Sequence, residues 1–249
     1  MKLLLTGYSG FVGSELRKQL VSANMSFSTL GRTEISEAEK HFPWTLGLDP
    51  NPQIFEDIDV LIHLAWKTDE RHSSANHLNI GGSQKLIESA RLSGVKVFFI
   101  SSLAAENPLS CYGAAKLKVE KINSLGVNIR LPKLVGQIDS KHTFLIWKLI
   151  KKLTFLPASQ RVFVNVGNLT EGVLAIIETV VSNCKPTTIT LSHRRVTMNE
   201  YIRRVLGFQA VSVPMFFLET IFALLHKLPA QKSKNLEDRW VSLKSSSGN

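Results

Sequence analysis

A short apolar run that ends in glycine and passes directly into a helix is the feature that most constrains how this chain folds. Residues 2–7 read KLLLTG, which is typical of a buried parallel strand. In the SGFVGSELRKQLVSA that follows, apolar residues recur at helical spacing. A strand that feeds a helix in this way favours a βαβ unit.

The same alternation of strand and helix continues along the chain. Further strands are expected at residues 27–32, 44–50, 58–66, 95–102 and 127–132, and helices at residues 77–94 and 112–126. Right-handed crossovers between these strands predict an α/β fold, a Rossmann-type doubly wound parallel sheet. Such sheets bind ligands outside the carboxyl ends of their strands.

Charge and cysteine content narrow the classes of partner. The net charge is +10, but the positive residues recur in separate groups, so an anionic small molecule is favoured over nucleic acid as the partner. Two cysteines give no disulfide framework and no metal-ligand spacing, which indicates a reducing, cytoplasmic compartment. The basic stretch FLIWKLIKKL is assigned to a substrate-binding lobe, and peripheral membrane contact is the less favoured alternative.

Three glycines at three-residue intervals, Gly7, Gly10 and Gly13, span the turn between the first strand and the first helix. Gly7 permits a tight turn, Gly10 lets the backbone approach a pyrophosphate, and Gly13 lets the helix pack on the strand. The helix start at Phe11 and Val12 offers free N–H groups and a positive dipole. The turn predicts a dinucleotide site, and a glycine-rich turn without a ligand is the alternative.

The end of the second strand bears on the choice of dinucleotide. An acidic residue there often holds the ribose hydroxyls, but this segment reads FSTLGR and carries Arg32 instead. An arginine at this place can pair with a 2′-phosphate, which favours NADP over NAD. The alternative is a solvent-exposed arginine with no ligand.

Five segments occur in order: TGYSGFVG, DVLIHLAW, the asparagine of HLNIGGSQKLIESA, FFISS and YGAAK. With them the chain resembles the extended short-chain dehydrogenase/reductase superfamily, and within it the NAD(P)-dependent nucleotide-sugar epimerase/dehydratase family. The resemblance covers most of the chain and is strongest up to about Val135. It implies an NAD(P)-dependent enzyme that acts on a nucleotide-linked sugar and forms a homodimer.

The resemblance also implies roles for individual residues. Ser102 matches the family's catalytic serine or threonine, and Tyr112 and Lys116 match its Tyr-x-x-x-Lys pair, which also contacts the cofactor. The remaining matches are binding positions: Leu64 and Ala65 beside the cofactor, Asp49 at the adenine, and Asn79 and Arg161 at the substrate.

Elementary chemistry explains the pairing of Tyr112 with Lys116. A free tyrosine has a pKa near 10 and is a poor acid/base at neutral pH. An ammonium four residues further on shares its helix face, favours the tyrosinate and lowers that pKa. Ser102 would hydrogen-bond the substrate oxygen and hold it in reach. Each residue also has a structural alternative: a packed tyrosine, a solvent lysine and a serine that caps a turn.

Departures from the family pattern refine the expected reaction. Leu103 and Ala104 replace the Asp-Glu pair of the family's dehydratases, which argues against 4,6-dehydration. Trp66 stands where a small residue is common, so it narrows the pocket or stacks on a ring. We therefore expect 4-keto reduction or 4-epimerisation. The alternatives are reduction of a small ketone or aldehyde, and a non-catalytic NADP-binding sensor or scaffold.

The expected domain organisation follows from where the pattern loosens. Residues 1–135 are assigned to a NAD(P)-binding Rossmann domain, to which residues 161–190 add. Residues 136–160 and 191–249 are assigned to a smaller carboxyl-terminal substrate-binding lobe, which is short for this family.

Overall fold

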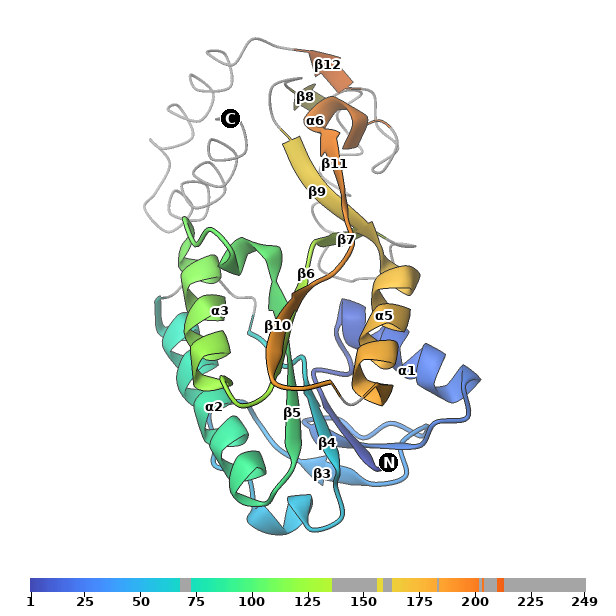
Figure 1. The fold of residues 1–249 in the computed structure, drawn as a ribbon, viewed down its shortest axis with the longest axis vertical. Coiled ribbons are helices and arrows are strands. Elements are labelled where there is room, and N and C mark those ends of the chain that lie inside the picture. Colours follow the sequence, from blue (N-terminus) through green and yellow to red (C-terminus); the bar gives the residue numbers. More distant parts are fainter. Residues whose placement is uncertain are drawn as a thin grey trace.

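A seven-stranded parallel sheet forms the centre of the computed structural model (Figure 1). The structure describes residues 1–67, 73–135, 156–158, 163–182, 184–201, 203 and 210–212. The strand order is β10-β6-β5-β4-β1-β2-β3, and every neighbouring pair is parallel. The strands of this sheet are β1 (Leu3–Thr6), β2 (Phe27–Gly31), β3 (His41–Pro43), β4 (Val60–His63), β5 (Lys96–Ser102), β6 (Val127–Leu131) and β10 (Thr187–Thr190). The predicted Rossmann-type fold is thereby confirmed.

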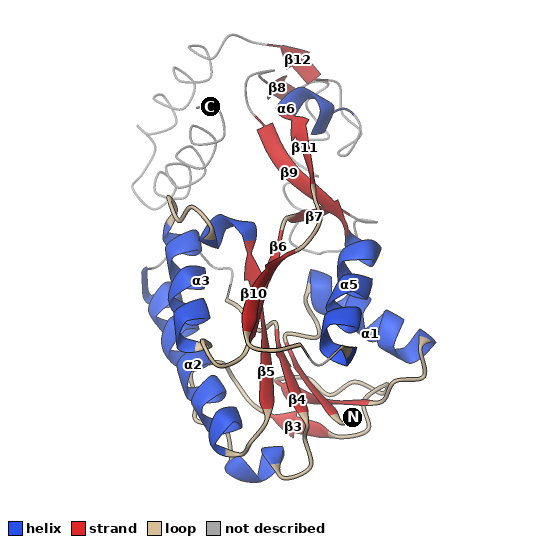
Figure 2. Ribbon diagram, viewed as in Figure 1, coloured by secondary structure: helices blue, strands red, loops and turns tan. Residues whose placement is uncertain are grey.

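Helices cover both faces of this sheet, as Figure 2 shows. One face carries α1 (Phe11–Ser22) and α5 (Leu169–Val181), and the other carries α2 (Ser73–Leu92) and α3 (Cys111–Ile122). Two short 3₁₀ turns are η1 (Pro52–Phe55) and η2 (Leu103–Ala105). The central strands β1, β4 and β5 are covered on both sides and consist largely of apolar residues, as expected of a parallel sheet.

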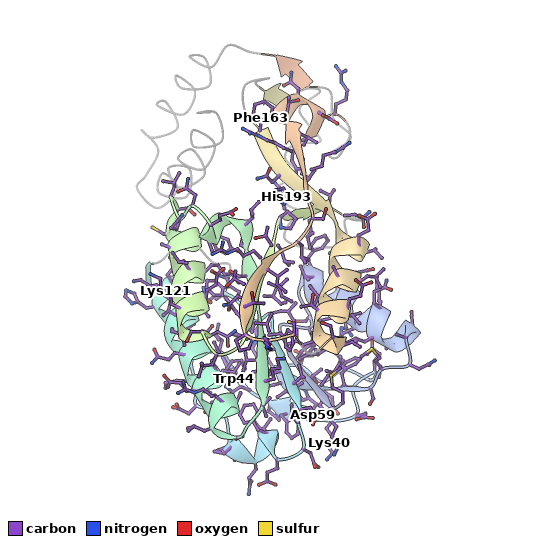
Figure 3. All side chains as sticks on the ribbon, in the orientation of Figure 1. Lys40, Trp44, Asp59, Lys121, Phe163 and His193 are labelled. Atoms are coloured by element: carbon purple, nitrogen blue, oxygen red, sulfur yellow. The ribbon has the colours of Figure 1, made fainter. Side chains whose placement is uncertain are left out.

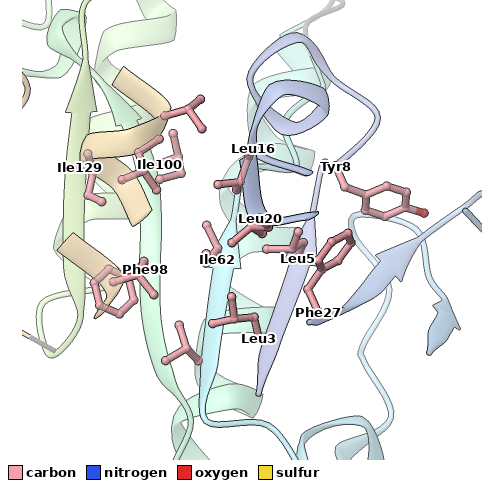
Figure 4. Close-up of a cluster of buried hydrophobic side chains, with 14 of the residues drawn as sticks. Leu3, Leu5, Tyr8, Leu16, Leu20, Phe27, Ile62, Phe98, Ile100 and Ile129 are labelled. Atoms are coloured by element: carbon pink, nitrogen blue, oxygen red, sulfur yellow. The ribbon is translucent and has the colours of Figure 1, made fainter. Parts of the chain in front are cut away.

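The core lies between the sheet and its helices. Figure 4 shows one cluster, in which Leu3, Ile62, Phe98 and Ile129 from four adjacent strands meet Leu16 of α1. Burying each such side chain stabilises the fold by about 1.5–3 kcal/mol relative to leaving it in water. This packing fixes the strands from which the candidate site is built.

Two smaller sheets lie beyond the carboxyl edge of the main sheet (Figure 1). The first contains β11 (Arg194–Thr197), β9 (Phe163–Asn168) and β7 (Lys133–Val135), with β9 antiparallel to β11 and parallel to β7. The second pairs β12 (Ala210–Ser212) with β8 (Leu156–Ala158), and the short helix α6 (Met198–Glu200) follows β11. Of these elements, β7 and β9 fall in residues assigned to the Rossmann domain, and β8, β11, α6 and β12 fall in residues assigned to the substrate-binding lobe. That division into domains stays a prediction.

One strand lies upstream of its predicted position. The strand expected at residues 44–50 is instead β3, His41–Pro43, and residues 44–50 form a loop. Gly47 has a φ of 107°, outside the range of an extended strand, and the Trp44 indole Nε1 donates to the Leu48 carbonyl across the loop at 3.0 Å. The stretch FLIWKLIKKL, at residues 144–153, lies outside the described residues.

Strand order places the ligand-binding edge. From β1 the chain proceeds outward through β2 and β3, whereas β4, β5 and β6 build the sheet in the opposite direction. The carboxyl ends of β1 and β4 therefore form the switch point at which such sheets bind ligands. Residues 7–13 follow β1, and residues 64–67 follow β4.

A buried histidine joins these two strands to α2. The ring of His63 is fully buried, with Nδ1 2.8 Å from Thr6 Oγ1 and Nε2 2.9 Å from Ser83 Oγ. Burial lowers the pKa of His63 to about 3, and the nearby charge of Lys116 acts in the same direction. His63 is thus a neutral structural side chain.

This depressed pKa predicts a pH dependence of stability. Between pH 6.5 and about 3 the unfolded chain binds a proton at His63 that the folded chain does not. The free energy of unfolding should therefore fall as the pH is lowered, with His63 contributing a slope of about 1.4 kcal/mol per pH unit. Urea unfolding at a series of pH values measures it. His63→Gln should lose this slope, the exposed control His77→Gln should keep it, and equal slopes in both variants would contradict the prediction.

Candidate functional site

The glycine turn after β1 is closely packed on two sides. Gly7 has a φ of 66°, and a Cβ atom on it would lie 2.5 Å from the backbone nitrogen of Ala65. A Cβ atom on Gly13 would lie 2.3 Å from the Gly7 carbonyl oxygen. Gly10 is less crowded, since its Cβ would meet only the Gly7 oxygen at 3.2 Å. Gly7 and Gly13 are therefore required by packing, and Gly10 leaves an open face for a ligand.

The start of α1 is suited to an anion. Gly10 is its N-cap residue and provides no side-chain acceptor, and the first turn contains no acidic residue. The first N–H groups of a helix have no partner within it, so those of Phe11, Val12 and Gly13 are available to a phosphate oxygen. Arg17 supports the turn, because its Nε donates to the Tyr8 carbonyl at 3.0 Å.

The end of β2 presents an exposed cation. Arg32 is exposed directly after Gly31 and forms no ion pair or hydrogen bond with any described residue. Below it, the buried Tyr8 ring fills the space that a larger residue at Gly31 would need, and the Tyr8 hydroxyl donates to the Thr33 carbonyl. The guanidinium is therefore free to meet an anionic group at this end of the rim.

Asp49 lies in the loop after β3 and is already paired. Its carboxylate accepts from Lys85 Nζ of α2 at 2.8 Å, and both side chains are exposed. In the structure, Asp49 thus contacts α2 and not the glycine turn. Its predicted contact with an adenine stays a prediction.

The segment after β4 is held from both sides. The Ala65 N–H donates to Thr6 Oγ1 at 3.2 Å, and the Leu64 N–H donates to the Thr6 carbonyl at 3.3 Å. The buried Asn79 amide accepts from the Lys67 N–H at 2.7 Å and donates to the Lys67 carbonyl at 3.0 Å. Asn79 therefore anchors the backbone next to Trp66, a contact that the sequence pattern did not reveal, and its contact with substrate stays a prediction.

The two serines that end β5 point to opposite faces of the sheet. Ser101 donates to the buried Glu120 carboxylate at 2.5 Å. Ser102 is half-buried, and its Oγ accepts from the Ala104 N–H at 3.3 Å, which caps η2. Because that hydrogen bond uses only a lone pair of Ser102, its hydroxyl proton is left to donate to a ligand.

Tyr112 and Lys116 lie one turn apart on α3, and the lysine is buried. The Lys116 Nζ donates to the Ile100 carbonyl at 2.9 Å. It stands 3.9 Å from the ring centroid of Trp66, 4.7 Å from that of Phe99 and 5.9 Å from that of Tyr112. The Trp66 and Tyr112 rings meet edge to face at 6.0 Å. Three aromatic rings and one carbonyl thus surround the ammonium.

The protonation of Lys116 is balanced near neutrality. Burial lowers the pKa of Lys116 to about 7, and the Glu120 carboxylate opposes that shift. Glu120 is fixed by a bidentate pair with Arg130, whose closest contact is 2.8 Å, and by Ser101. Glu120 and Arg130 were missed in the sequence, although Glu120 is four residues after Lys116 and so shares its helix face.

Arg161 lies outside the described residues, so its predicted place at the substrate is not part of this geometry. The described ranges contain no group of three or more His, Cys, Asp or Glu residues placed to hold a metal ion. Among the same ranges, no helix is long and apolar enough to cross a membrane.

Known proteins share both the sequence pattern and the fold. Residues 3–191 match the family model described as NAD dependent epimerase/dehydratase family. An uncharacterized UDP-glucose epimerase of Bacillus subtilis, YtcB, is 30% identical over 159 residues, which are 49% of this chain and 50% of that protein. The matched region thus spans about half the length of this curated relative.

Solved structures resemble the fold at low sequence identity. The UDP-N-acetylglucosamine 4-epimerase from Bacillus cereus has a TM-score of 0.71 at 18% identity, covering 86% of this chain and 85% of that one. MoeE5 in complex with UDP-glucuronic acid and NAD has a TM-score of 0.69 at 17% identity, covering 98% and 100%.

The packing of the glycine turn predicts a contrast between two Gly→Ala substitutions. Gly13→Ala should lower the free energy of unfolding by about 1–3 kcal/mol, because its Cβ collides with the backbone of the turn. Gly81→Ala in α2 should instead raise it by roughly 1 kcal/mol, since no atom lies within 4 Å of that Cβ and alanine favours the helix. Urea denaturation monitored by circular dichroism compares them. Equal effects of the two substitutions would show that the turn is not tightly packed.

Proposed function

The chain belongs to the NAD dependent epimerase/dehydratase family, and on that premise we propose that it catalyses 4-keto reduction or 4-epimerisation of a nucleotide-linked sugar. The observation that carries the proposal is the position of Tyr112 and Lys116. They lie on α3, at the rim of the sheet where the glycine turn and Ser102 also lie. A bound nicotinamide nucleotide supplies or takes the hydride, and the residues of this chain handle the proton.

The proton chemistry follows from the contacts of the three side chains. Reduction of a carbonyl requires a proton on its oxygen, and the Tyr112 hydroxyl is the proposed donor; in the oxidation direction the same group accepts the proton. The charged Lys116 lowers the free energy of the tyrosinate that remains after donation. Ser102, with its uncommitted hydroxyl proton, hydrogen-bonds the same oxygen and holds it near Tyr112.

The cofactor assignment rests on the turn and on Arg32. The open face at Gly10 and the uncapped start of α1 fit a pyrophosphate. Arg32, exposed and unpaired within the described ranges, supports a 2′-phosphate and hence NADP over NAD. The solved structure of MoeE5, which has a similar fold, contains NAD. The preference of this chain for NADP over NAD is therefore proposed from Arg32.

The substrate class is supported by a cavity in the smaller sheet and by charge. A cavity of about 390 Å³ is lined by Phe163, Asn165, His193 and Arg195, and the Arg195 guanidinium lies 4.4 Å from the Phe163 ring centroid. Figure 3 places Phe163 and His193 beyond the carboxyl edge of the main sheet. A cation beside an aromatic ring suits the base and diphosphate of a nucleotide, and the net charge of +10 favours an anionic substrate.

One observation favours a smaller substrate. The Trp66 ring stands beside both Lys116 and Tyr112 and so occupies volume next to the acid/base pair. Reduction of a small ketone or aldehyde with the same residues is therefore the second candidate function. A homodimer in the cytoplasm remains the expectation for either.

Turnover tests the proposal. UDP-glucose and UDP-N-acetylglucosamine serve as probes of epimerisation, and NADPH oxidation with a dTDP-4-keto-6-deoxysugar or a small aldehyde serves as the probe of reduction. Tyr112→Phe should lower kcat by about 100-fold or more, since it removes the proton donor, while the affinity for the nicotinamide cofactor stays within about twofold. Tyr201→Phe, a buried tyrosine beside Val196, is the matched control and should keep full activity. Unchanged turnover in Tyr112→Phe would refute the assignment.

The cofactor preference has its own test. Arg32→Ala should weaken NADPH binding by roughly 10- to 100-fold, because a hydrogen-bonded charge pair is lost, and should leave NADH binding unchanged. Arg91→Ala, an exposed arginine at the end of α2, should change neither. Fluorescence titration of the unaltered chain and both variants with each nucleotide gives the dissociation constants. If the unaltered chain binds NADH as tightly as NADPH, the preference for NADP is wrong.

A further inference from the structure

Trp66 makes the shortest contact between an aromatic ring and the buried lysine of the site. Its ring centroid lies 3.9 Å from Lys116 Nζ, closer than the rings of Phe99 and Tyr112. An ammonium has three N–H donors, and the Ile100 carbonyl accepts from one of them. Aromatic faces, which carry negative charge density, lie close to the ammonium as well.

The backbone that carries this ring is anchored on both sides. Ala65 is hydrogen-bonded to Thr6 of β1, and Lys67 is held twice by Asn79 of α2. The Trp66 ring also packs against Phe99 at 6.2 Å and edge to face against Tyr112 at 6.0 Å. The indole is therefore not a surface ring that meets the lysine by chance; two elements fix its position beside α3.

We propose that Trp66 is a positioning residue of the acid/base set, whose indole face stabilises the charged form of Lys116 and fixes the ammonium beside Tyr112. This inference rests on the proposed roles of Tyr112 and Lys116. It differs from a packing role, in which any apolar side chain of similar size would serve.

The protonation state of Lys116 is set by opposing effects, and the indole ring contributes to one of them. Burial disfavours the ammonium and lowers the pKa of Lys116 to about 7. The charged and titratable groups that face it in the described ranges are Tyr112 and Glu120 on α3 and His63 on β4, with Arg130 of β6 acting through Glu120. Glu120 opposes the effect of burial, and the quadrupole of the indole acts in the same direction as Glu120. Only the charged lysine can stabilise a tyrosinate, so the ring supports the chemistry by keeping the proton on Lys116.

Two substitutions separate this role from packing. Trp66→Leu keeps an apolar cover over Lys116 but removes the ring, whereas Trp66→Phe keeps an aromatic face. The pKa of Lys116 should fall by about one unit, a tenfold loss of proton affinity, in Trp66→Leu relative to Trp66→Phe. The ¹³C shift of the lysine Cε, followed against pH in ¹³C-lysine-labelled protein and assigned with Lys116→Met, measures it. Equal pKa values in the two variants would overturn the proposal.

Fluorescence of the unaltered chain supplies a measurement that does not depend on how Trp66→Leu folds. The chain contains four tryptophans, and the difference between its spectrum and that of Trp66→Phe isolates the emission of Trp66. That emission should change with a midpoint near pH 7 as Lys116 titrates, and should lose the transition in Lys116→Met but keep it in Tyr112→Phe. A transition that persists in Lys116→Met overturns the proposal.

The outcome of these measurements does not depend on whether the proposed function is correct. Neither uses a cofactor or a substrate. A chain in which Trp66 raises the pKa of Lys116 but which binds no NADPH and turns over no probe would support the ring's effect and refute the proposed enzyme. A chain that reduces or epimerises a probe, but in which the Trp66 ring has no effect on the pKa of Lys116, would support the proposed enzyme and refute the inference.

Discussion

The candidate site depends on the pairing of β1 with β4 at the centre of the main sheet. In the register of these strands Thr6 lies opposite His63, and the hydrogen bond between their side chains ties the two strand ends together. The strand order diverges from this junction, so the rim is open there. The glycine turn continues from one strand and the segment with Trp66 from the other, and the missing side chain of Gly7 lets the two meet. A one-residue slip of this pairing would displace the glycine turn relative to the segment that carries Trp66.

A second constraint is the cost of burying charge between α3 and the sheet. Removing an ammonium or a carboxylate from water costs several kcal/mol per ion unless partners replace the lost hydration. Here Lys116 has a carbonyl and aromatic rings, and Glu120 has Ser101 and a bidentate arginine. Apolar side chains of similar volume would serve stability equally well. Folding stability alone therefore does not account for this arrangement.

The fold could be predicted from the sequence because its signals are local. Apolar runs, helical spacing and a glycine turn reveal strands, helices and their order without reference to distant residues. The third strand was misplaced because it is three residues long and its position depends on pairing with β2, which no local pattern records. The site could be predicted only in part for the same reason. The spacing of Tyr112 and Lys116 is local, but Trp66 and Phe99 reach Lys116 through tertiary packing. Asn79 was assigned to the substrate, and no local pattern revealed that its amide holds the backbone of Lys67.

The smaller sheet is attached directly to the rim of the main sheet, so a ligand that extends beyond the cofactor site can contact both. Among the residues that the structure describes, the chain passes three times between the main sheet with its helices and the smaller sheet, each time through a very short connection. Only Pro132 separates β6 from β7, β9 leads directly into α5, and residues 191–193 join β10 to β11. The strands β6 and β10 leave the main sheet at their carboxyl ends, where Ser102 and the glycine turn also lie. Short connections permit little displacement, so chain connectivity itself holds the smaller sheet beyond the rim that carries Ser102 and the glycine turn. A ligand that reaches from Tyr112 toward Phe163 would then meet groups whose relative positions are set by the same strands that build the core.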